Sequence, residues 1–162
     1  MLTYTDTPIV LPLSNPTSKC EALPEDVITW SDGKAIVATG SPFDDVAYGG
    51  NTYAIAQCNN AYIFPGLGLG VIAVKASQIN DAMFMAASEA LASCSPRIQD
   101  SNAKLLPSIS AIHEVSKTIA IAVAKQAIAD GLAAPVSEDR IAELVERNFW
   151  LPEYRDYKRT TT

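Results

Sequence analysis

The chain has 162 residues, a formal net charge of −6 at pH 7, and 48% hydrophobic against 19% charged residues. This length and balance are typical of one soluble globular domain and exclude an intrinsically disordered chain. The acidic balance argues against a nucleic-acid partner, because the nearest basic group, Arg155, Lys158 and Arg159, is interrupted by Asp156 and is typical of a solvated tail.

The three cysteines, Cys20, Cys58 and Cys94, are odd in number and far apart, with no CxxC motif among them. We therefore expect free thiols, no zinc site and a cytoplasmic location. No basic-then-apolar leader opens the chain, and the longest apolar stretch, 61–76, is interrupted by one proline and three glycines. The sequence thus predicts neither a signal peptide nor a membrane span.

Two short apolar runs, 8–13 and 35–39, each end at a dense turn signal, as buried parallel strands do. A helix is predicted between them, beginning at Pro24, which suits a first helical position, and ending near Gly33. The order strand, helix, strand over 8–40 predicts an α/β fold with a parallel sheet.

The turns after the two strands, at 14–17 and 40–42, mark the carboxyl edge of the predicted sheet. In open α/β sheets, ligands bind beyond this edge. Asn15 lies in the first turn, so the residues themselves point to a binding site there.

The remaining chain is expected to form a hairpin over 44–56, helices within 59–150 and a tail over 151–162. Three of the helices have clear signals: one covers 82–92, one starts near Ser110, and one has Ser137 as its N-cap.

Only two parallel strands are evident, and two are too few for a stable doubly wound sheet. Either further strands are hidden or the chain is a piece of a larger domain. We favour a piece, because the pattern of elements begins midway.

The segment Gly68-Leu-Gly70-Val-Ile-Ala73 matches a G-x-G-x-x-A dinucleotide fingerprint, but no clear strand directly precedes it. The alternative is a helix whose small residues, Gly66, Gly70 and Ala73, let a neighbouring helix approach closely. We favour helix packing over phosphate binding.

Charged and titratable residues give weaker signals. His113 is the only histidine, and we interpret it as a surface or first-turn helical residue rather than a catalytic one. The acidic pair Asp44 and Asp45 follows Pro42 in a loop, and a solvated loop is favoured over a weak Mg²⁺ site.

Amide side chains are concentrated at two places, Asn15 in a strand-end turn and the group Gln57, Asn59 and Asn60. Amides donate and accept hydrogen bonds without carrying charge, which suits a carboxylate, a hydroxyl or a carboxamide ligand. The same residues also serve well in turns and helix caps. The residues alone leave both interpretations open.

Three ordered segments resemble the NAD-binding domain of malic enzymes. They are Pro-Leu-Ser-Asn-Pro-Thr-Ser at 12–18, Ala-Thr-Gly-Ser-Pro-Phe at 38–43, and Gln-Cys-Asn-Asn-Ala-Tyr-Ile-Phe-Pro-Gly at 57–66. The segment 148–154 is similar to the carboxyl terminus of the bacterial NAD-linked form. The resemblance covers nearly the whole chain from Pro8, and the three motifs in this order make it specific.

The resemblance implies oxidative decarboxylation of malate to pyruvate and CO₂, with NAD or NADP as the oxidant and Mg²⁺ or Mn²⁺ as the metal. It implies that Asn15 contacts both cofactor and substrate, that Asn59 does the same, and that Asn60 contacts the substrate. Cys58 stands where relatives often have glycine. The general base lysine, the acid tyrosine, the metal-binding acids and the Gly-rich loop of the family have no match here, so we expect no catalytic residue, no metal ligand and no activity in this chain alone.

The resemblance also implies a fold: the C-terminal portion of a Rossmann-type doubly wound parallel sheet, with a long helical C-terminal region. Cut alone, this piece would leave a strand edge and an apolar helix face open, so we expect a homo-oligomer or a partner that supplies the missing half. The alternatives are a non-catalytic interaction or structural module, and an amide-rich domain that binds a small molecule without a reaction.

Overall fold

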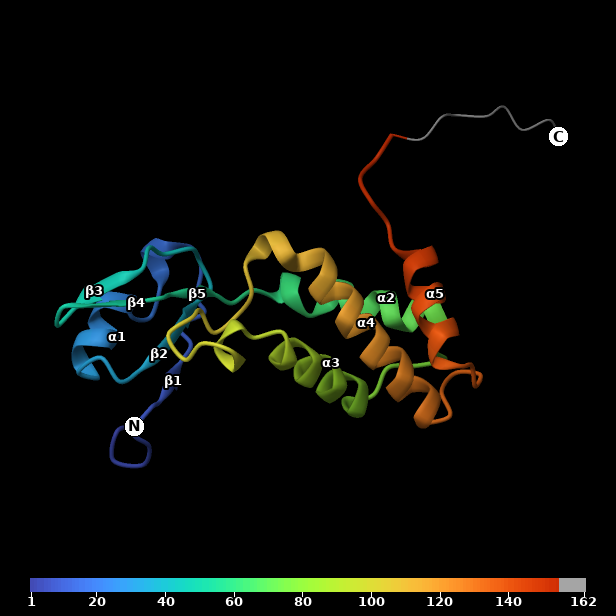
Figure 1. Cartoon of the computed structure of the whole chain (residues 1–162), viewed down its shortest axis with the longest axis horizontal. Helices are drawn as coiled ribbons and strands as arrows, with labels where there is room; N and C mark the ends of the chain where they lie inside the picture. Colours follow the sequence, from blue (N-terminus) through green and yellow to red (C-terminus); the bar gives the residue numbers. More distant parts are fainter. Residues whose placement is uncertain (155–162) are drawn as a thin grey trace.

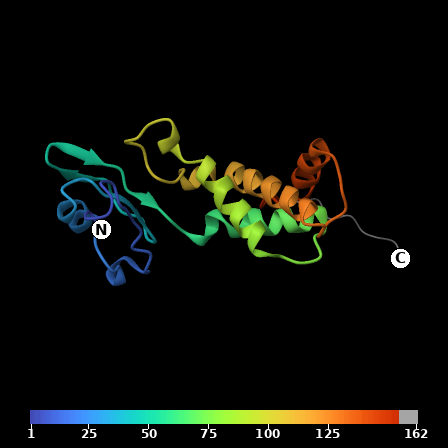
Figure 2. The ribbon, with the colours of Figure 1, turned by 90° about the horizontal axis from the view of Figure 1, so that it is seen from below.

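The computed structural model describes residues 1–154 and shows an elongated molecule (Figure 1). The strands and α1 gather at one end and the helices α2 to α5 at the other, and a view from below gives the same division (Figure 2). The loop between α3 and α4 returns to the strand end, where Lys104 pairs with Asp45 at 3.2 Å. The basic tail residues Arg155, Lys158 and Arg159 lie outside the described residues.

A three-stranded parallel sheet is built from β1 (Ile9–Val10), β2 (Ile36–Thr39) and β5 (Ala56–Gln57), in the order β1-β2-β5. Only two of these strands were evident in the sequence, and β5 is a further one. It has two residues and no alternating pattern, so only its backbone pairing with β2 identifies it.

The helix α1 (Pro24–Trp30) begins with proline at its first position, as predicted. It packs Val27 and Ile28 against Val37 of β2 and closes one core of the molecule. The chain leaves the helix through Gly33, whose φ of +73° is the left-handed conformation that favours glycine.

The hairpin is smaller than the predicted range of 44–56. It comprises β3 (Val46–Tyr48) and β4 (Asn51–Tyr53), joined at Gly49-Gly50, where both residues have positive φ. Such a two-residue turn matches the twist of the flanking strands. Ala56, at the end of the predicted range, belongs instead to the parallel sheet.

Four long helices form the other end: α2 (Phe64–Val74), α3 (Asp81–Ser93), α4 (Ile112–Ala129) and α5 (Glu138–Asn148). Short 3₁₀ turns lie at Thr17–Lys19, Asn60–Tyr62, Pro96–Ile98 and Ile109–Ala111. The predicted start of α4 near Ser110 was two residues early, because the 3₁₀ turn capped by Ser108 precedes it. No helix among residues 1–154 has both the length and the apolar character that a membrane crossing requires.

The glycines of α2 serve helix packing. A Cβ on Gly66 would lie 2.7 Å from the Cβ of Ile119, and one on Gly70 would lie 2.6 Å from the carbonyl oxygen of Ala120. A Cβ on Gly68 would meet nothing within 4 Å. The backbones of α2 and α4 therefore approach through Gly66 and Gly70, which confirms the packing interpretation of the fingerprint-like segment.

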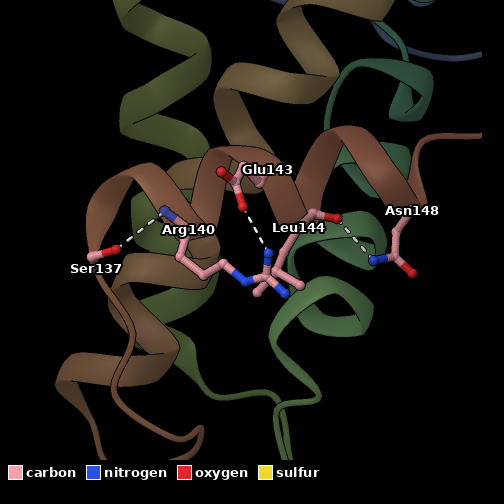
Figure 3. Close-up of polar contacts among 5 residues, drawn as sticks. All are labelled: Ser137, Arg140, Glu143, Leu144 and Asn148. Atoms are coloured by element: carbon pink, nitrogen blue, oxygen red, sulfur yellow. Dashed lines mark hydrogen bonds and ion pairs between the residues drawn. The ribbon is translucent and has the colours of Figure 1, made fainter.

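The last helix, α5, is fixed at its start by a predicted cap (Figure 3). Ser137 Oγ accepts a hydrogen bond from the backbone N–H of Arg140 at 3.3 Å, and Arg140 pairs with Glu143 at 2.7 Å. Asn148 donates to the carbonyl oxygen of Leu144 at 2.8 Å near the end of the helix. Besides these local contacts, Ile141 and Val145 of α5 are buried against Ala73 of α2 and Ala120 and Ala124 of α4.

Candidate functional site

The carboxyl ends of the three parallel strands meet at one edge of the sheet. Gly40, just after β2, donates its backbone N–H to the carbonyl oxygen of Pro12 at 3.1 Å. Cys58, just after β5, donates its backbone N–H to the carbonyl oxygen of Thr39 at 2.8 Å. The segments 12–15, 40–41 and 58–60 therefore lie side by side, as the sequence predicted for the first two.

Asn15 is tied to the neighbouring strand end by its side-chain amide. Its Oδ1 accepts a hydrogen bond from Ser41 Oγ at 2.7 Å, and its Nδ2 donates to the carbonyl oxygen of Leu13 at 3.3 Å. The residue as a whole is exposed. Asn15 thus lies at the surface, with hydrogen bonds on both polar atoms of its amide.

The turn after β2 is packed too closely for a side chain at position 40. A Cβ on Gly40 would lie 2.3 Å from the carbonyl oxygen of Leu13 and 3.0 Å from Asn15 Nδ2. Thr39, which is fully buried, donates its hydroxyl to the carbonyl oxygen of Ser41 at 2.8 Å. Gln57 Nε2 donates to the carbonyl oxygen of Gly40 at 3.4 Å, so β5 supports the same turn.

Asn59 and Asn60 lie at the third strand end. Asn59 Oδ1 accepts from the backbone N–H of Ala61 at 3.0 Å and caps the 3₁₀ turn that precedes α2. Asn60 is exposed, and its side chain makes no hydrogen bond within residues 1–154. The structure brings Asn15 into contact with Ser41, whereas within the described residues no hydrogen bond joins Asn15 to Asn59 or Asn60.

Cys58 lies beside this edge but is not activated. Burial of its half-buried side chain raises the pKa of the thiol, which therefore stays protonated near neutral pH. The neighbouring Tyr62 is buried, and its hydroxyl donates to the carbonyl oxygen of Pro107. Burial, and then the proximity of Cys58, raise the pKa of Tyr62 as well. Neither side chain has the character of a nucleophile or a base at neutral pH.

The residues of this part of the chain do not fit a divalent metal ion. Within residues 1–154, no group of three His, Cys, Asp or Glu side chains lies close enough to share one. Asp45 instead accepts the backbone N–H of Ile55 at 3.1 Å and pairs with Lys104. His113 is exposed in the first turn of α4, with its ring 5.5 Å from that of Phe149 in an edge-on arrangement.

Ser41 is the site residue that sequence reasoning did not single out. It appeared only as part of a turn signal and of the segment 38–43, and its contact with Asn15 spans 26 positions of sequence. Ser41 could have been identified from its position just after a buried strand, at the sheet edge where Asn15 was also expected. Which residue of that turn would face Asn15 depends on the packing of Gly40.

Comparison with known proteins identifies the domain type. Residues 1–128 match the family described as "Malic enzyme, NAD binding domain". An NAD-dependent malic enzyme of Pseudomonas savastanoi pv. phaseolicola is 59% identical over 152 residues, which cover 94% of this chain and 27% of the relative. One from Sodalis glossinidius is 58% identical over 158 residues, 98% of this chain and 28% of the relative. The chain thus spans little more than a quarter of the length of these curated relatives.

Solved structures of malic enzymes are also similar to this chain. The crystal structure of the malic enzyme of Entamoeba histolytica is similar with a TM-score of 0.68 and 28% identity, over 87% of this chain and 26% of that one. That of the malic enzyme of Pyrococcus horikoshii Ot3 gives a TM-score of 0.62 and 33% identity, over 86% of this chain and 29% of that one.

Proposed function

This chain belongs to the family of malic enzyme NAD-binding domains, and we propose that its strand-end amides hold NAD and malate against each other in a longer oxidoreductase. The proposed reaction converts (S)-malate and NAD⁺ to pyruvate, CO₂ and NADH. The observation that carries the proposal is Asn15, an exposed amide held in place at the edge where three parallel strands end.

The amides have separate proposed roles. Asn15 and Asn59 bind both the nicotinamide end of the cofactor and the substrate, and Asn60 binds the substrate. Amide groups suit this position, because they can hydrogen bond to a carboxylate, a hydroxyl and a carboxamide without adding charge. When bound, NAD accepts the hydride that leaves the C2 carbon of malate. The chain's own residues orient the two molecules for that transfer.

The remaining chemistry would come from other parts of a longer protein. Within residues 1–154 we find no residues suited to a metal ion, so the Mg²⁺ or Mn²⁺ of the family would be bound elsewhere. The general base lysine and the acid tyrosine would also lie elsewhere, and this chain alone is proposed to be inactive. NADP in place of NAD is a second possibility for the cofactor.

A proposal for the fold of the longer protein also follows from the family of this chain. We propose that residues 1–162 are the C-terminal part of a doubly wound Rossmann-type domain, in which the strand-helix-strand unit 8–40 and the hairpin region 44–56 lead into the helices of 59–150 and the tail 151–162. The parallel sheet with α1 packed on it supports this arrangement. A cytoplasmic location is proposed from the three free thiols.

We further propose that this chain, taken alone, forms a homo-oligomer. Within the described residues β1 pairs only with β2, so its other edge carries unpaired backbone groups. Ile9, Leu11 and Leu13 are each 43–50% exposed along this segment. An apolar strand edge of this kind favours association with another chain.

Calorimetric titration of the purified chain with NAD⁺, in the presence of malate, tests the ligand proposal. Replacing Asn15 or Asn59 by alanine is expected to weaken NAD⁺ binding about twofold to tenfold, the effect of one lost hydrogen bond. Asn102→Ala, in the exposed loop between α3 and α4, is the matched control and should leave the affinity unchanged. Equal affinities for the wild type and the Asn15 and Asn59 variants would contradict the proposal and favour a non-catalytic interaction module.

A further inference from the structure

The side-chain amide of Asn15 can adopt two orientations that differ in chemistry. Rotation by 180° exchanges the carbonyl oxygen, which only accepts hydrogen bonds, with the NH₂ group, which only donates them. The two orientations have nearly the same shape, so packing alone does not choose between them. A ligand at the strand ends would meet a different pattern of donors in each one.

The carbonyl oxygen of Leu13 selects one of the two orientations, and Ser41 holds the amide in it. The carbonyl oxygen of Leu13 only accepts, so the atom 3.3 Å from it must be the donor Nδ2. Ser41 Oγ then faces Oδ1 at 2.7 Å and must donate its hydroxyl proton. In the reversed amide, Oδ1 would face the Leu13 carbonyl, and two acceptors would repel each other. Leu13 contacts the amide through its backbone, whereas Ser41 does so through its side chain. Only the Ser41 hydrogen bond can therefore be removed by a side-chain substitution.

Ser41 is itself held independently of any ligand. It is 8% exposed, and its carbonyl oxygen accepts the hydroxyl of the fully buried Thr39 at 2.8 Å. Gly40 next to it allows the turn to pack on the Leu13 carbonyl, where a Cβ would lie 2.3 Å away. The backbone of Ser41 is therefore held in place, and it carries Oγ to within 2.7 Å of Asn15 Oδ1.

We infer that Ser41 is a positioning residue, which holds the amide of Asn15 so that the free N–H of its Nδ2 donates to a carboxylate or carbonyl oxygen of the bound ligand. One Nδ2 proton is directed to Leu13, and the second remains for the ligand. The identity of the ligand in this inference rests on the proposed function. The hydrogen bond between Ser41 and Asn15 exists in the chain without any ligand. Loss of the Ser41 hydroxyl would leave the amide held only by the 3.3 Å hydrogen bond to the Leu13 carbonyl, and would reduce the fraction of molecules ready to bind.

A double-mutant cycle tests the inference. The NAD⁺ affinity in the presence of malate is measured for the wild type, Ser41→Ala, Asn15→Ala and the double variant. Ser41→Ala should weaken binding about fivefold in the wild-type background and less than twofold when Asn15 is already alanine. Equal losses in both backgrounds would show a general structural role and overturn the inference, as would no loss in either. Ser88→Ala, which removes an exposed hydroxyl on α3, is the matched control.

A second measurement does not depend on the ligand. In a ¹H–¹⁵N NMR spectrum of the labelled chain, the side-chain NH₂ signals of Asn15 are identified by their loss in Asn15→Ala. Ser41→Ala should change the chemical shifts of these two signals and make those shifts depend more strongly on temperature. Ser88→Ala should leave both signals in place. Unshifted Asn15 signals in a folded Ser41→Ala chain would overturn the inference. If the wild type binds no NAD⁺ but the signals move as expected, the proposed function fails while the positioning of Asn15 by Ser41 stands.

Discussion

At the scale of single residues, the strand-end site depends on the glycine at position 40 as much as on the polar side chains around it. Gly40 lies where a Cβ would be 2.3 Å from the carbonyl oxygen of Leu13, and that contact involves rigid backbone on both sides. The turn after β2 cannot relax without moving Ser41 away from Asn15. Stability and ligand geometry are therefore coupled at this position.

Gly40→Ala should destabilise the chain by about 1–3 kcal/mol, because the strand ends must separate to admit the methyl group. It should also weaken NAD⁺ binding more than its effect on stability explains. Urea unfolding and calorimetry on the same preparation measure the two effects. Gly40→Ala unfolding like the wild type would contradict the close packing of this turn.

Cys58 gives a second test at this scale, through pH. Because burial disfavours the thiolate, the pKa of Cys58 is raised, and its thiolate forms at a higher pH than that of an exposed cysteine. Alkylation by iodoacetamide, followed at Cys58 by peptide mass spectrometry as pH increases, should have its midpoint above that of a short cysteine peptide. A midpoint at or below that of the peptide would show that the thiol is not shielded.

At the scale of elements, helix packing is the part of the fold that the sequence predicted best. The apolar positions Val115, Ile119 and Val123 recur at helical spacing, and all three are buried in α4. Gly66 and Gly70 were expected to admit a neighbouring helix, and α4 is that neighbour. These features are local or periodic, so they can be recognised in one sequence.

The contact between α2 and α4 predicts opposite outcomes for two glycines of one helix. Gly70→Ala should destabilise the chain by about 1–3 kcal/mol, since its Cβ would lie 2.6 Å from the carbonyl oxygen of Ala120. Gly68→Ala should stabilise it by about 0.5–1 kcal/mol, because nothing lies within 4 Å and alanine is the better helix former. Denaturant unfolding of both variants checks the signs, and destabilisation of similar size in both would rule out the close approach at Gly70.

The strand β5 and the contact between Ser41 and Asn15 could not be predicted in the same way. β5 has only two residues and is defined by its parallel pairing with β2, which leaves no periodic signal. Sequence placed Asn15, Asn59 and Asn60 as candidate ligand contacts, but it did not show that Ser41 would be the partner of Asn15. Both missing facts concern pairing between distant segments, and a single sequence contains no measure of that distance.

At the scale of the whole molecule, β1 has an apolar edge and the chain spans about 27% of the length of a curated relative. We expect this edge to drive self-association of the purified chain, with sedimentation velocity showing a species larger than 17.3 kDa as concentration rises. Ile9→Lys should reduce that association, because a charge on an edge strand opposes pairing. Ile98→Lys, at an exposed position beyond α3, is the control. A wild-type chain that remains monomeric at high concentration would contradict the homo-oligomer proposal.

The central claim is that the strand-end amides hold cofactor and substrate in one site, and its most direct test is the thermodynamic coupling between the two ligands. The measurement is the affinity of the chain for NAD⁺ with and without malate, in the wild type and in Asn15→Ala. Our account predicts that malate tightens NAD⁺ binding in the wild type, and that Asn15→Ala removes this coupling. A folded wild-type chain that binds NAD⁺ equally with and without malate, or that binds neither ligand, would contradict it.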